Sequence, residues 1–361
     1  MEWLKRILVQ LAIGANVMAA LLLLACSLCS GLNPAEYPRA AIFVLGFPLL
    51  LLLNLAFVAF WLVFSIRYVW LPFVGMLFSV SYIYDYCPVN WPSGRPEGAL
   101  KLITYNTEFL GNGEKAEDGH YPLVEYLAAS GADIICIQEG VAQSKGPSAA
   151  YADSVMEAAG YHILRLKDGK AEPQFIYSRL PILSARRISY ESSTNGSVAV
   201  ELLYDGDTVL VVNNHFESYK LTPEDKERYK EIIKEPEKED TESNSRALVR
   251  KMAVASRVRG PQADSVLNYI RESGREAVLV CGDFNEPPVS YSCRRMGTEL
   301  TSAFRQSGNG LGLSYNQKGF YFRIDHIFVS DYWRTYDTHV DKSATWSDHY
   351  PLVTYLKKHK K

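Results

Sequence analysis

The sequence predicts an α/β domain that follows three membrane-spanning helices. Two observations carry this prediction. Residues 1–84 are mostly apolar and hold few charges, whereas the charged residues are concentrated in the rest of the chain. From residue 100 onward, short apolar segments that end in polar residues alternate with helical patterns, as expected of strands and helices built around sheets. A chain of 361 residues is long enough for a membrane region and one large globular domain.

Three apolar segments lie in the N-terminal region, at residues 7–30, 40–64 and 68–84. The first two exceed the ~20 residues needed to cross a hydrocarbon core. The third is at the lower limit of length but is flanked by Trp and Tyr, which are typical of membrane interfaces. A competing interpretation is a lipoprotein signal, because Leu-Leu-Ala-Cys at 23–26 resembles a lipid-attachment site. Cleavage there would leave two spans in place, so we favour a membrane domain over residues 1–84.

The basic residues beside these spans predict the orientation of the chain. Lys5 and Arg6 precede the first span and Arg67 lies between the second and third, whereas Arg39 marks the opposite loop. The positive-inside rule makes the first group cytoplasmic. An odd number of spans then places the remainder outside the cytoplasm of an inner or plasma membrane. The Pro- and Gly-rich segment 85–99 is expected to be a linker.

Seven apolar segments after the linker are predicted strands, because each is rich in β-branched or aromatic residues and stops at a polar cluster. They are residues 100–106, 132–139, 175–178, 198–204, 208–215, 277–285 and 323–330. Asp-Gly-Asp between the fourth and fifth is typical of a tight hairpin. Helical patterns lie at 121–130 and 260–274. Together these elements predict one domain over residues 100–361.

Segment 217–246 is dense in charges of both signs. Thr222 and Pro223 are suited to cap and begin a helix, so we expect an exposed helix at 222–234 followed by a mobile loop. A solvated excursion is the simpler interpretation. Because the segment directly follows His215, a lid or recognition loop is the functional alternative.

The cysteines and the charge balance narrow the function further. Four of the six cysteines lie in apolar spans or predicted strands, where a thiol behaves as a small apolar side chain. Cys87 and Cys293 remain, and they could pair or stay free. No Cys and His spacing typical of a zinc site is present. A formal net charge of −2 does not favour a long nucleic-acid track, which needs clustered Lys and Arg.

Polar side chains gather at or near the predicted strand ends. They are Asn106, Glu139, Asn213, His215, Asp283, Asn285, Asp325, Asp348 and His349. Each alone is explained equally well by a turn, a loop cap or a structural histidine. Together, these carboxylates, amides and imidazoles suit a hard divalent cation and a phosphate group.

Six motifs stand in the order found in the endonuclease/exonuclease/phosphatase superfamily, which the chain resembles from about residue 100 to 356. They are TYNTEFL, IQE, NNHFES, GDFNEPP, RIDHIFV and SDHYPL. GDFN followed by RIDHIF and SDHYP is the specific part. The resemblance implies a four-layered α/β sandwich, in which two packed mixed sheets are flanked by helices. It also implies Mg²⁺-dependent attack of water on a phosphate ester, with Mn²⁺ as an alternative metal.

The resemblance also implies roles at the metal and the attacking water. Glu139 is expected to hold the metal with Asn106 beside it, and Asp348 is expected near the metal, directly or through water. Asp283 is expected to orient and deprotonate the attacking water. Asn285 is expected to position the phosphate or Asp283.

The two histidines receive the remaining roles from the resemblance. His349 is expected to contact the phosphate and stabilise the transition state. Asp325 is expected to fix the tautomer of one of the two histidines, and we favour His349. His215 is expected to touch the scissile phosphate and to protonate the leaving oxygen. Asn213 is expected to support His215 and to contribute to substrate binding.

The expected function is therefore a membrane-anchored, metal-dependent phosphoesterase, either a phosphodiesterase or a phosphatase. Its expected substrates are lipid head groups, nucleotides or nucleic acid near the membrane, and no obligate protein partner is evident. One alternative is an extracytoplasmic nuclease. Another is a catalytically weak phosphate-binding scaffold, although every motif position holds a competent residue type.

Overall fold

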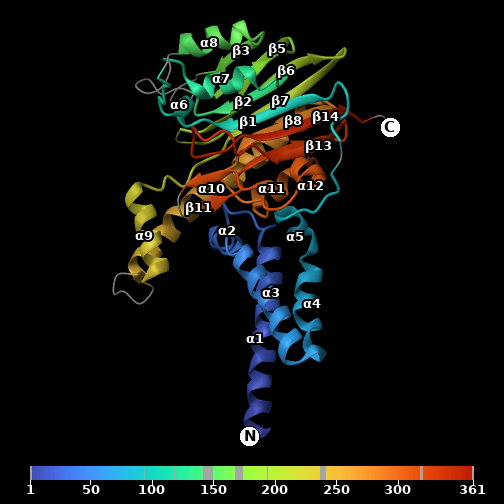
Figure 1. Ribbon diagram of the computed structural model, residues 1–361, viewed down its shortest axis with the longest axis vertical. Coiled ribbons are helices and arrows are strands. Elements are labelled where there is room, and N and C mark those ends of the chain that lie inside the picture. Colours follow the sequence, from blue (N-terminus) through green and yellow to red (C-terminus); the bar gives the residue numbers. More distant parts are fainter. Residues whose placement is uncertain are drawn as a thin grey trace.

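Two six-stranded mixed sheets form the centre of the chain beyond the N-terminal helices (Figure 1). The computed structural model describes residues 2–92, 94–117, 119–140, 149–166, 174–192, 194–235, 241–317 and 320–359. The first sheet has the order β13-β14-β1-β2-β4-β3. Its strands are β1 Leu100–Asn106, β2 Ile134–Gln138, β3 His162–Leu166, β4 Gln174–Ser178, β13 Trp333–Val340 and β14 Leu352–Lys358.

The second sheet has the order β5-β6-β7-β8-β12-β9. Its strands are β5 Ile182–Ile188, β6 Gly196–Tyr204, β7 Asp207–His215, β8 Ala277–Asp283, β9 Thr301–Ser302 and β12 Asp325–Val329. A separate two-stranded sheet pairs β10 Tyr315–Gln317 with β11 Phe320–Phe322. Strands β1 and β2 are parallel, as are β7 and β8, so the carboxyl ends of each pair lie at one edge.

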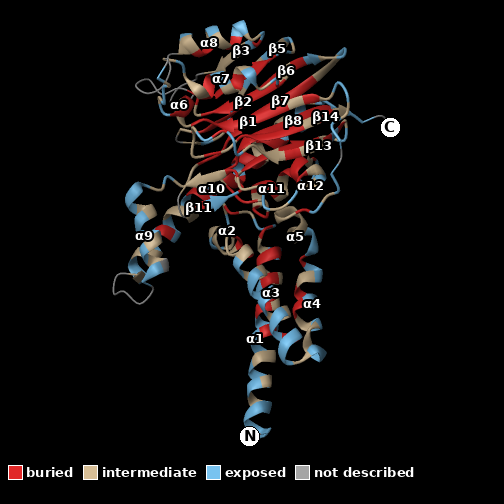
Figure 2. Cartoon of the chain, viewed as in Figure 1, coloured by how far each residue is buried: buried red, intermediate tan, exposed pale blue. Residues whose placement is uncertain are grey.

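The main apolar core lies between the two sheets. Leu102 and Ile134 of the first sheet and Val211 and Leu279 of the second belong to one buried cluster. Figure 2 shows this buried interior along the central strands. Burial on this scale, at about 25 cal/mol per Å² of apolar surface, is the main force that holds the sheets together.

Helices cover both outer faces and complete four layers. α7 Pro122–Ala129 and α8 Ala149–Ala158 pack on the first sheet, and α10 Thr241–Ser273 and α11 Tyr291–Met296 pack on the second. The remaining helices of this part of the chain are α6 Glu108–Gly111, α9 Pro223–Lys234 and α12 Ala303–Ser307. The predicted fold class, a four-layered α/β sandwich, is confirmed.

The N-terminal helices are α1 Glu2–Cys29, α2 Pro38–Val44, α3 Phe47–Phe64, η1 Ile66–Tyr68, α4 Trp70–Phe78 and α5 Val80–Tyr86. Among the described residues, α1 and α3 are each long and apolar enough to cross a membrane. A third candidate is the pair Ile66–Phe78 and Val80–Tyr86, which is bent by 72°. Small residues let these helices approach, since a Cβ on Gly75 would lie 2.8 Å from the Cβ of Ala20.

Two predicted spans differ from the helices observed. The segment 40–64 is not continuous, because α2 ends at Val44 and α3 begins at Phe47. Pro48 lies in the first turn of α3, where it has no backbone N–H to extend the preceding helix. The segment 68–84 bends at Ser79, whose hydroxyl accepts a hydrogen bond from Ser27 of α1 at 3.0 Å. The predicted linker also begins inside a helix, since α5 extends to Tyr86.

The N-terminal helices and their loops pack against the sandwich. A Cβ on Gly260 of α10 would lie 2.9 Å from Pro34, in the loop before α2. The carboxylate of Asp85 pairs with Arg305 of α12, and Arg323 donates to the carbonyl of Tyr86 at 3.2 Å. All six cysteines are free, so Cys87 and Cys293 do not pair.

The charged excursion contains more helix than expected. α9 matches the predicted helix at 222–234, and Thr222 and Asp225 form a capping box at its start. α10 then begins at Thr241, within the stretch expected to be a loop, and continues through Pro261 to Ser273. Residues 236–240 of the expected loop lie outside the described residues.

Candidate active site

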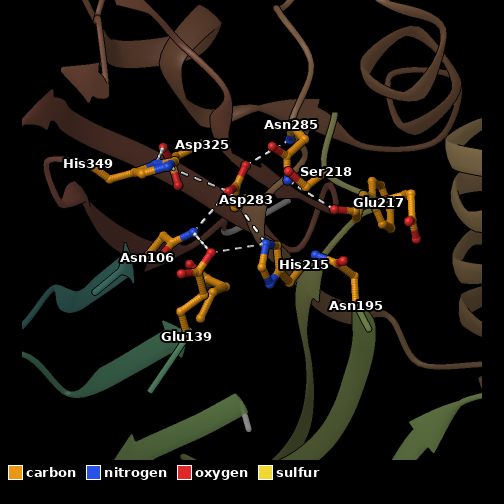
Figure 3. A network of polar contacts seen from close by, with 12 residues as sticks. Asn106, Glu139, Asn195, His215, Glu217, Ser218, Asp283, Asn285, Asp325 and His349 are labelled. Carbon is orange, nitrogen blue, oxygen red and sulfur yellow. Dashed lines mark hydrogen bonds and ion pairs between the residues drawn. The ribbon is translucent and has the colours of Figure 1, made fainter. Parts of the chain in front are cut away.

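Strand ends from both sheets meet at one edge of the sandwich (Figure 3). Asn106 ends β1 opposite Gln138, the residue before Glu139. His215 ends β7 opposite Asp283, which ends β8. Because both strand pairs are parallel, their carboxyl ends bring these side chains together.

Direct contacts join the two sheets at this edge. The Asn106 Nδ2 atom donates to Glu139 Oε1 at 2.9 Å and to Asp283 Oδ2 at 3.1 Å. The Nε2 atom of His215 lies 3.6 Å from Glu139 Oε1 and 3.8 Å from Asp283 Oδ2. Asp283 and His215 are buried, whereas Glu139 keeps 22% of its side chain exposed. The buried groups of the cluster are therefore reached from solvent at Glu139.

A second imidazole approaches Asp283 from the other side. The Nδ1 atom of His349 donates to Asp325 Oδ2 at 2.7 Å, and its Nε2 atom lies 3.7 Å from Asp283 Oδ2. Asp325 starts β12 directly opposite Asp283 in the antiparallel pair with β8. Asp325 thus holds the ring with Nε2 directed at Asp283.

The charges in the cluster shift the pKa values of its buried groups. Burial raises the pKa of Asp283 and Asp325 raises it further, against the opposing effect of His349. Burial lowers the pKa of His349, but Asp325 and Asp283 outweigh it and raise the value to about 10. At neutral pH His349 is therefore an imidazolium, which suits it to stabilise an anion rather than to accept a proton.

The backbone is held in left-handed conformations at two site residues. Glu139 has a φ of 51° and Asn285 a φ of 53°. For a residue such as Glu this region costs about 1–2 kcal/mol, so the surrounding bonds must hold it in place. Gly282 is required for a related reason: its φ is 132°, and a Cβ there would lie 1.9 Å from the carbonyl oxygen of Asn214.

Asn285 connects the two loops that follow β7 and β8. Its backbone N–H donates to Asp283 Oδ1 at 2.8 Å, and its Nδ2 atom donates to the carbonyl of Phe216 at 3.0 Å. The first bond orients the carboxylate of Asp283. Sequence reasoning expected Asn285 to position Asp283 or the phosphate, and this geometry serves the first purpose.

Asn213 lies between the sheets, away from the exposed part of the cluster. Its Oδ1 atom accepts from Gln138 Nε2 at 2.6 Å, and its Nδ2 atom donates to the carbonyl of Ile137 at 3.0 Å. The side chain is fully buried in these bonds. Its position suits a support for the strand that carries His215, and the expected contact of Asn213 with substrate disagrees with this burial.

Asp348 borders the cluster. Its Oδ2 atom accepts from Gln317 Nε2 at 2.9 Å. With Glu108 it lines an open pocket of about 520 Å³ that also contacts Trp346. Burial raises the pKa of Glu108, and the charge of Asp348 raises it further.

Sequence reasoning did not single out Arg259 or Glu286. Arg259 is fully buried in α10, where its Nε atom donates to Glu286 Oε1 at 2.8 Å and its Nη1 atom donates to the carbonyl of Glu217 at 2.7 Å. The arginine thereby ties together the two loops that follow His215 and Asn285. Glu286 directly follows the GDFN motif, but no local signal indicates its partner on a distant helix.

The donor set fits a divalent cation. Atoms of Asp283, Asp325 and His349 lie within 4.8 Å of one another, and Glu139 and Asn106 lie beside them. Because His349 is protonated and bonded to Asp325, the carboxylate of Glu139 and the amide oxygen of Asn106 are the better ligands. The Oδ1 atom of Asp325 is buried and has no hydrogen-bond partner among the described residues. Oxygen donors predominate once Glu139 and Asn106 are included, and hard cations such as Mg²⁺ prefer them.

Many solved structures are similar to this chain, among them the following three. The human Nocturnin catalytic domain with bound sulfate shares 14% identity, with a TM-score of 0.53, over 74% of this chain and 97% of that one. A family protein from Bacteroides thetaiotaomicron shares 18% identity, with a TM-score of 0.47, over 75% of this chain and 100% of that one. The 3′ phosphatase NExo from Neisseria shares 17% identity, with a TM-score of 0.48, over 73% and 100%. No curated protein matches the chain.

Two family models match the sequence in separate regions. One, described as Domain of unknown function (DUF8431), matches residues 6–86. The other, described as Endonuclease/Exonuclease/phosphatase family, matches residues 103–349, which contain every residue of the cluster. On this match and the four-layered fold, the chain belongs to the endonuclease/exonuclease/phosphatase family.

Proposed function

We propose that this protein is a Mg²⁺-dependent phosphoester hydrolase. The observation that carries the proposal is the convergence of Asn106, Glu139, His215, Asp283 and His349 from both sheets, with contacts of 2.9–3.8 Å. Phosphoryl chemistry needs a metal, a water activator and cationic groups around one phosphorus atom. This cluster offers a residue for each role.

Glu139 and Asn106 would hold the metal, with Asp348 nearby. When bound, the metal would neutralise the phosphate oxygens as negative charge develops. Asp283 would orient the attacking water and accept its proton, and the raised pKa of Asp283 brings this carboxylate closer to neutral pH as a base. The backbone N–H of Asn285 would keep the second oxygen of Asp283 fixed during proton transfer.

The two imidazoles would act on the phosphate from opposite sides of Asp283. His349 carries its charge at neutral pH and would bind a phosphate oxygen through Nε2, while Asp325 holds Nδ1. His215 would donate a proton to the leaving oxygen. Asp325 does not need to change protonation state in this scheme, because its role is to orient the imidazole of His349 and keep it protonated.

The proposal is tested by hydrolysis of bis(p-nitrophenyl) phosphate by the full chain in detergent. We expect activity with Mg²⁺, loss with a chelator, and a decrease in kcat of about 10³-fold or more for Asp283→Asn. The matched control is Asp331→Asn, which changes an exposed aspartate outside the site. Equal hydrolysis by Asp283→Asn and the parent would refute the enzymatic role.

We further propose that the N-terminal helices anchor the enzyme in a membrane, with the sandwich outside the cytoplasm, and that lipid head groups are the substrate class. Two helices apolar enough to span a bilayer support the anchoring. A panel of sphingomyelin, inositol phosphates, DNA and RNA, each with Mg²⁺ and with chelator, tests the substrate. Preferential hydrolysis of DNA or RNA would contradict the lipid assignment.

A further inference from the structure

Residues 243–263 of α10 carry an excess of positive charge. They contain no acidic residue, and their basic residues are Arg246, Arg250, Lys251, Arg257 and Arg259. Two of these have acidic partners outside the segment, because Arg246 pairs with Glu242 and Lys251 with Asp225. The formal net charge of the whole chain, −2, does not indicate this local excess of basic residues. It also has no part in the chemistry proposed above, apart from the buried contacts of Arg259.

The exposed arginines lie on one face of the helix. Arg246, Arg250 and Arg257 are exposed and fall within about 40° of one another at 3.6 residues per turn. Val249 and Val254 flank them, with 42% and 58% exposure. Leu248 and Ala255 lie on the opposite side and are buried, so this basic face points away from the packed side of the helix. We call Arg246, Val249, Arg250, Val254 and Arg257 the basic face.

Contacts at its end direct the basic face towards the N-terminal helices. The Nε atom of Arg257 donates to the carbonyl of Ala35 at 3.5 Å, in the loop between α1 and α2. Gly260, one turn further along α10, approaches Pro34 in the same loop. In Figure 1, α9 and the beginning of α10 descend from the sandwich to the level of α2 and α3. The basic face therefore continues from the loop that joins the apolar helices.

We propose that the basic face binds the anionic head groups of the bilayer in which the N-terminal helices are anchored. Each Lys or Arg near an anionic surface contributes about 1 kcal/mol of binding, and apolar side chains between them enter the interface. Three arginines flanked by two exposed valines fit both requirements. The inference rests on the membrane anchoring proposed above, and it does not depend on the catalytic chemistry.

A nucleic acid is the other polyanion that a basic helix binds. Single strands are held by stacking of bases on aromatic side chains, whereas the apolar members of the basic face are valines. A nucleic acid would also have to enter between the basic face and the loop at Ala35, where Arg257 is in contact. Both observations favour the bilayer.

Hydrogen–deuterium exchange of the full chain in lipid nanodiscs tests the proposal. Discs of phosphatidylcholine alone are compared with discs that contain one quarter phosphatidylglycerol. We expect the amides of residues 241–258 to exchange about fivefold more slowly in the anionic discs, as expected from a gain of at least 1 kcal/mol. The difference should vanish at high salt and in the triple variant Arg246→Gln/Arg250→Gln/Arg257→Gln.

A matched control removes three exposed basic residues elsewhere, Arg186→Gln/Arg334→Gln/Lys342→Gln, and should keep the parent's difference. Equal exchange in the two kinds of disc would overturn the proposal. So would protection of the same segment by a single-stranded oligonucleotide in phosphatidylcholine discs, with no effect of anionic lipid. Incorporation into the neutral discs reports anchoring separately, and hydrolysis of bis(p-nitrophenyl) phosphate reports catalysis separately.

Discussion

His326 of β12 and His349, which contacts β12 through Asp325, differ in charge because their surroundings differ. His326 is buried, and its Nε2 atom donates to the carbonyl of Glu286 at 2.9 Å. Burial, and then the charge of Arg323, lower the pKa of His326 to about 4. Next to it in the sequence, Asp325 helps raise the pKa of His349 to about 10. One imidazole is therefore neutral and the other charged at neutral pH.

Asp325→Asn is expected to lower kcat by about 10³–10⁴-fold, because Asn preserves the shape but removes the charge that keeps His349 protonated and oriented. Initial rates on bis(p-nitrophenyl) phosphate with saturating Mg²⁺ measure the effect. Asp331→Asn again serves as the control. A decrease of less than threefold would show that the charge of Asp325 has no part in catalysis.

The neutral state of His326 predicts loss of stability in mild acid. Its pKa is about 4 in the folded chain, compared with about 6.5 for an unperturbed histidine, so between these values the unfolded chain binds more protons. The stability is complete above pH 6.5 and decreases as the pH falls towards 4, by about 3 kcal/mol in total. Denaturation midpoints in detergent between pH 7.5 and 5 measure the slope. His326→Gln should flatten this slope, and an unchanged slope would contradict the assignment.

At the scale of elements, sequence patterns located most of what forms the site. Apolar segments ending in polar residues marked β1, β7 and β8 to within two residues, and Asp-Gly-Asp marked the turn between β6 and β7. These signals are local, since they depend on periodicity and turn chemistry. The start of α10 was not predicted, and in the structure α10 packs against α9 and α2.

Contacts between distant elements account for the rest of what sequence could not supply. The pairing of Arg259 with Glu286 joins a helix to a loop through a fully buried ion pair, and no spacing rule connects them. The break between α2 and α3 lies at residues 45–46, just before Pro48, inside an apolar segment without a charge. The burial of Asn213 between the sheets depends on Gln138 from the other sheet.

Arg259→Met is expected to destabilise the protein by about 3–5 kcal/mol, because it leaves the carboxylate of Glu286 buried without its partner. Thermal unfolding of the full chain in detergent, followed by circular dichroism, measures the loss. The double variant Arg259→Met/Glu286→Gln removes the unpaired charge as well and should recover part of the stability. If the two variants are equally unstable, the ion pair is not the source of the effect.

At the scale of the whole molecule, the apolar helices and the sandwich form one connected body. Asp85 at the end of α5 pairs with Arg305 of α12, and Gly260 of α10 packs against the loop before α2. The orientation of the apolar helices therefore also sets the side of the membrane on which the active site lies. The charges beside the helices predict which side of the membrane the N-terminus lies on. The side predicted for the sandwich also depends on whether the bent pair Ile66–Phe78 and Val80–Tyr86 is a span.

Fusion of a reporter that is active only outside the cytoplasm decides both the orientation and the number of spans. With Lys5, Arg6 and Arg67 on the cytoplasmic side, we expect a reporter after Asn33 to be active and one after Arg67 to be inactive. A reporter after Lys361 should be active if the bent pair crosses the bilayer. Activity after Asn33 without activity after Lys361 would show that only α1 and α3 span, and would place the active site in the cytoplasm. Activity after Arg67 alone would invert the predicted topology, because it would place the most basic loops outside.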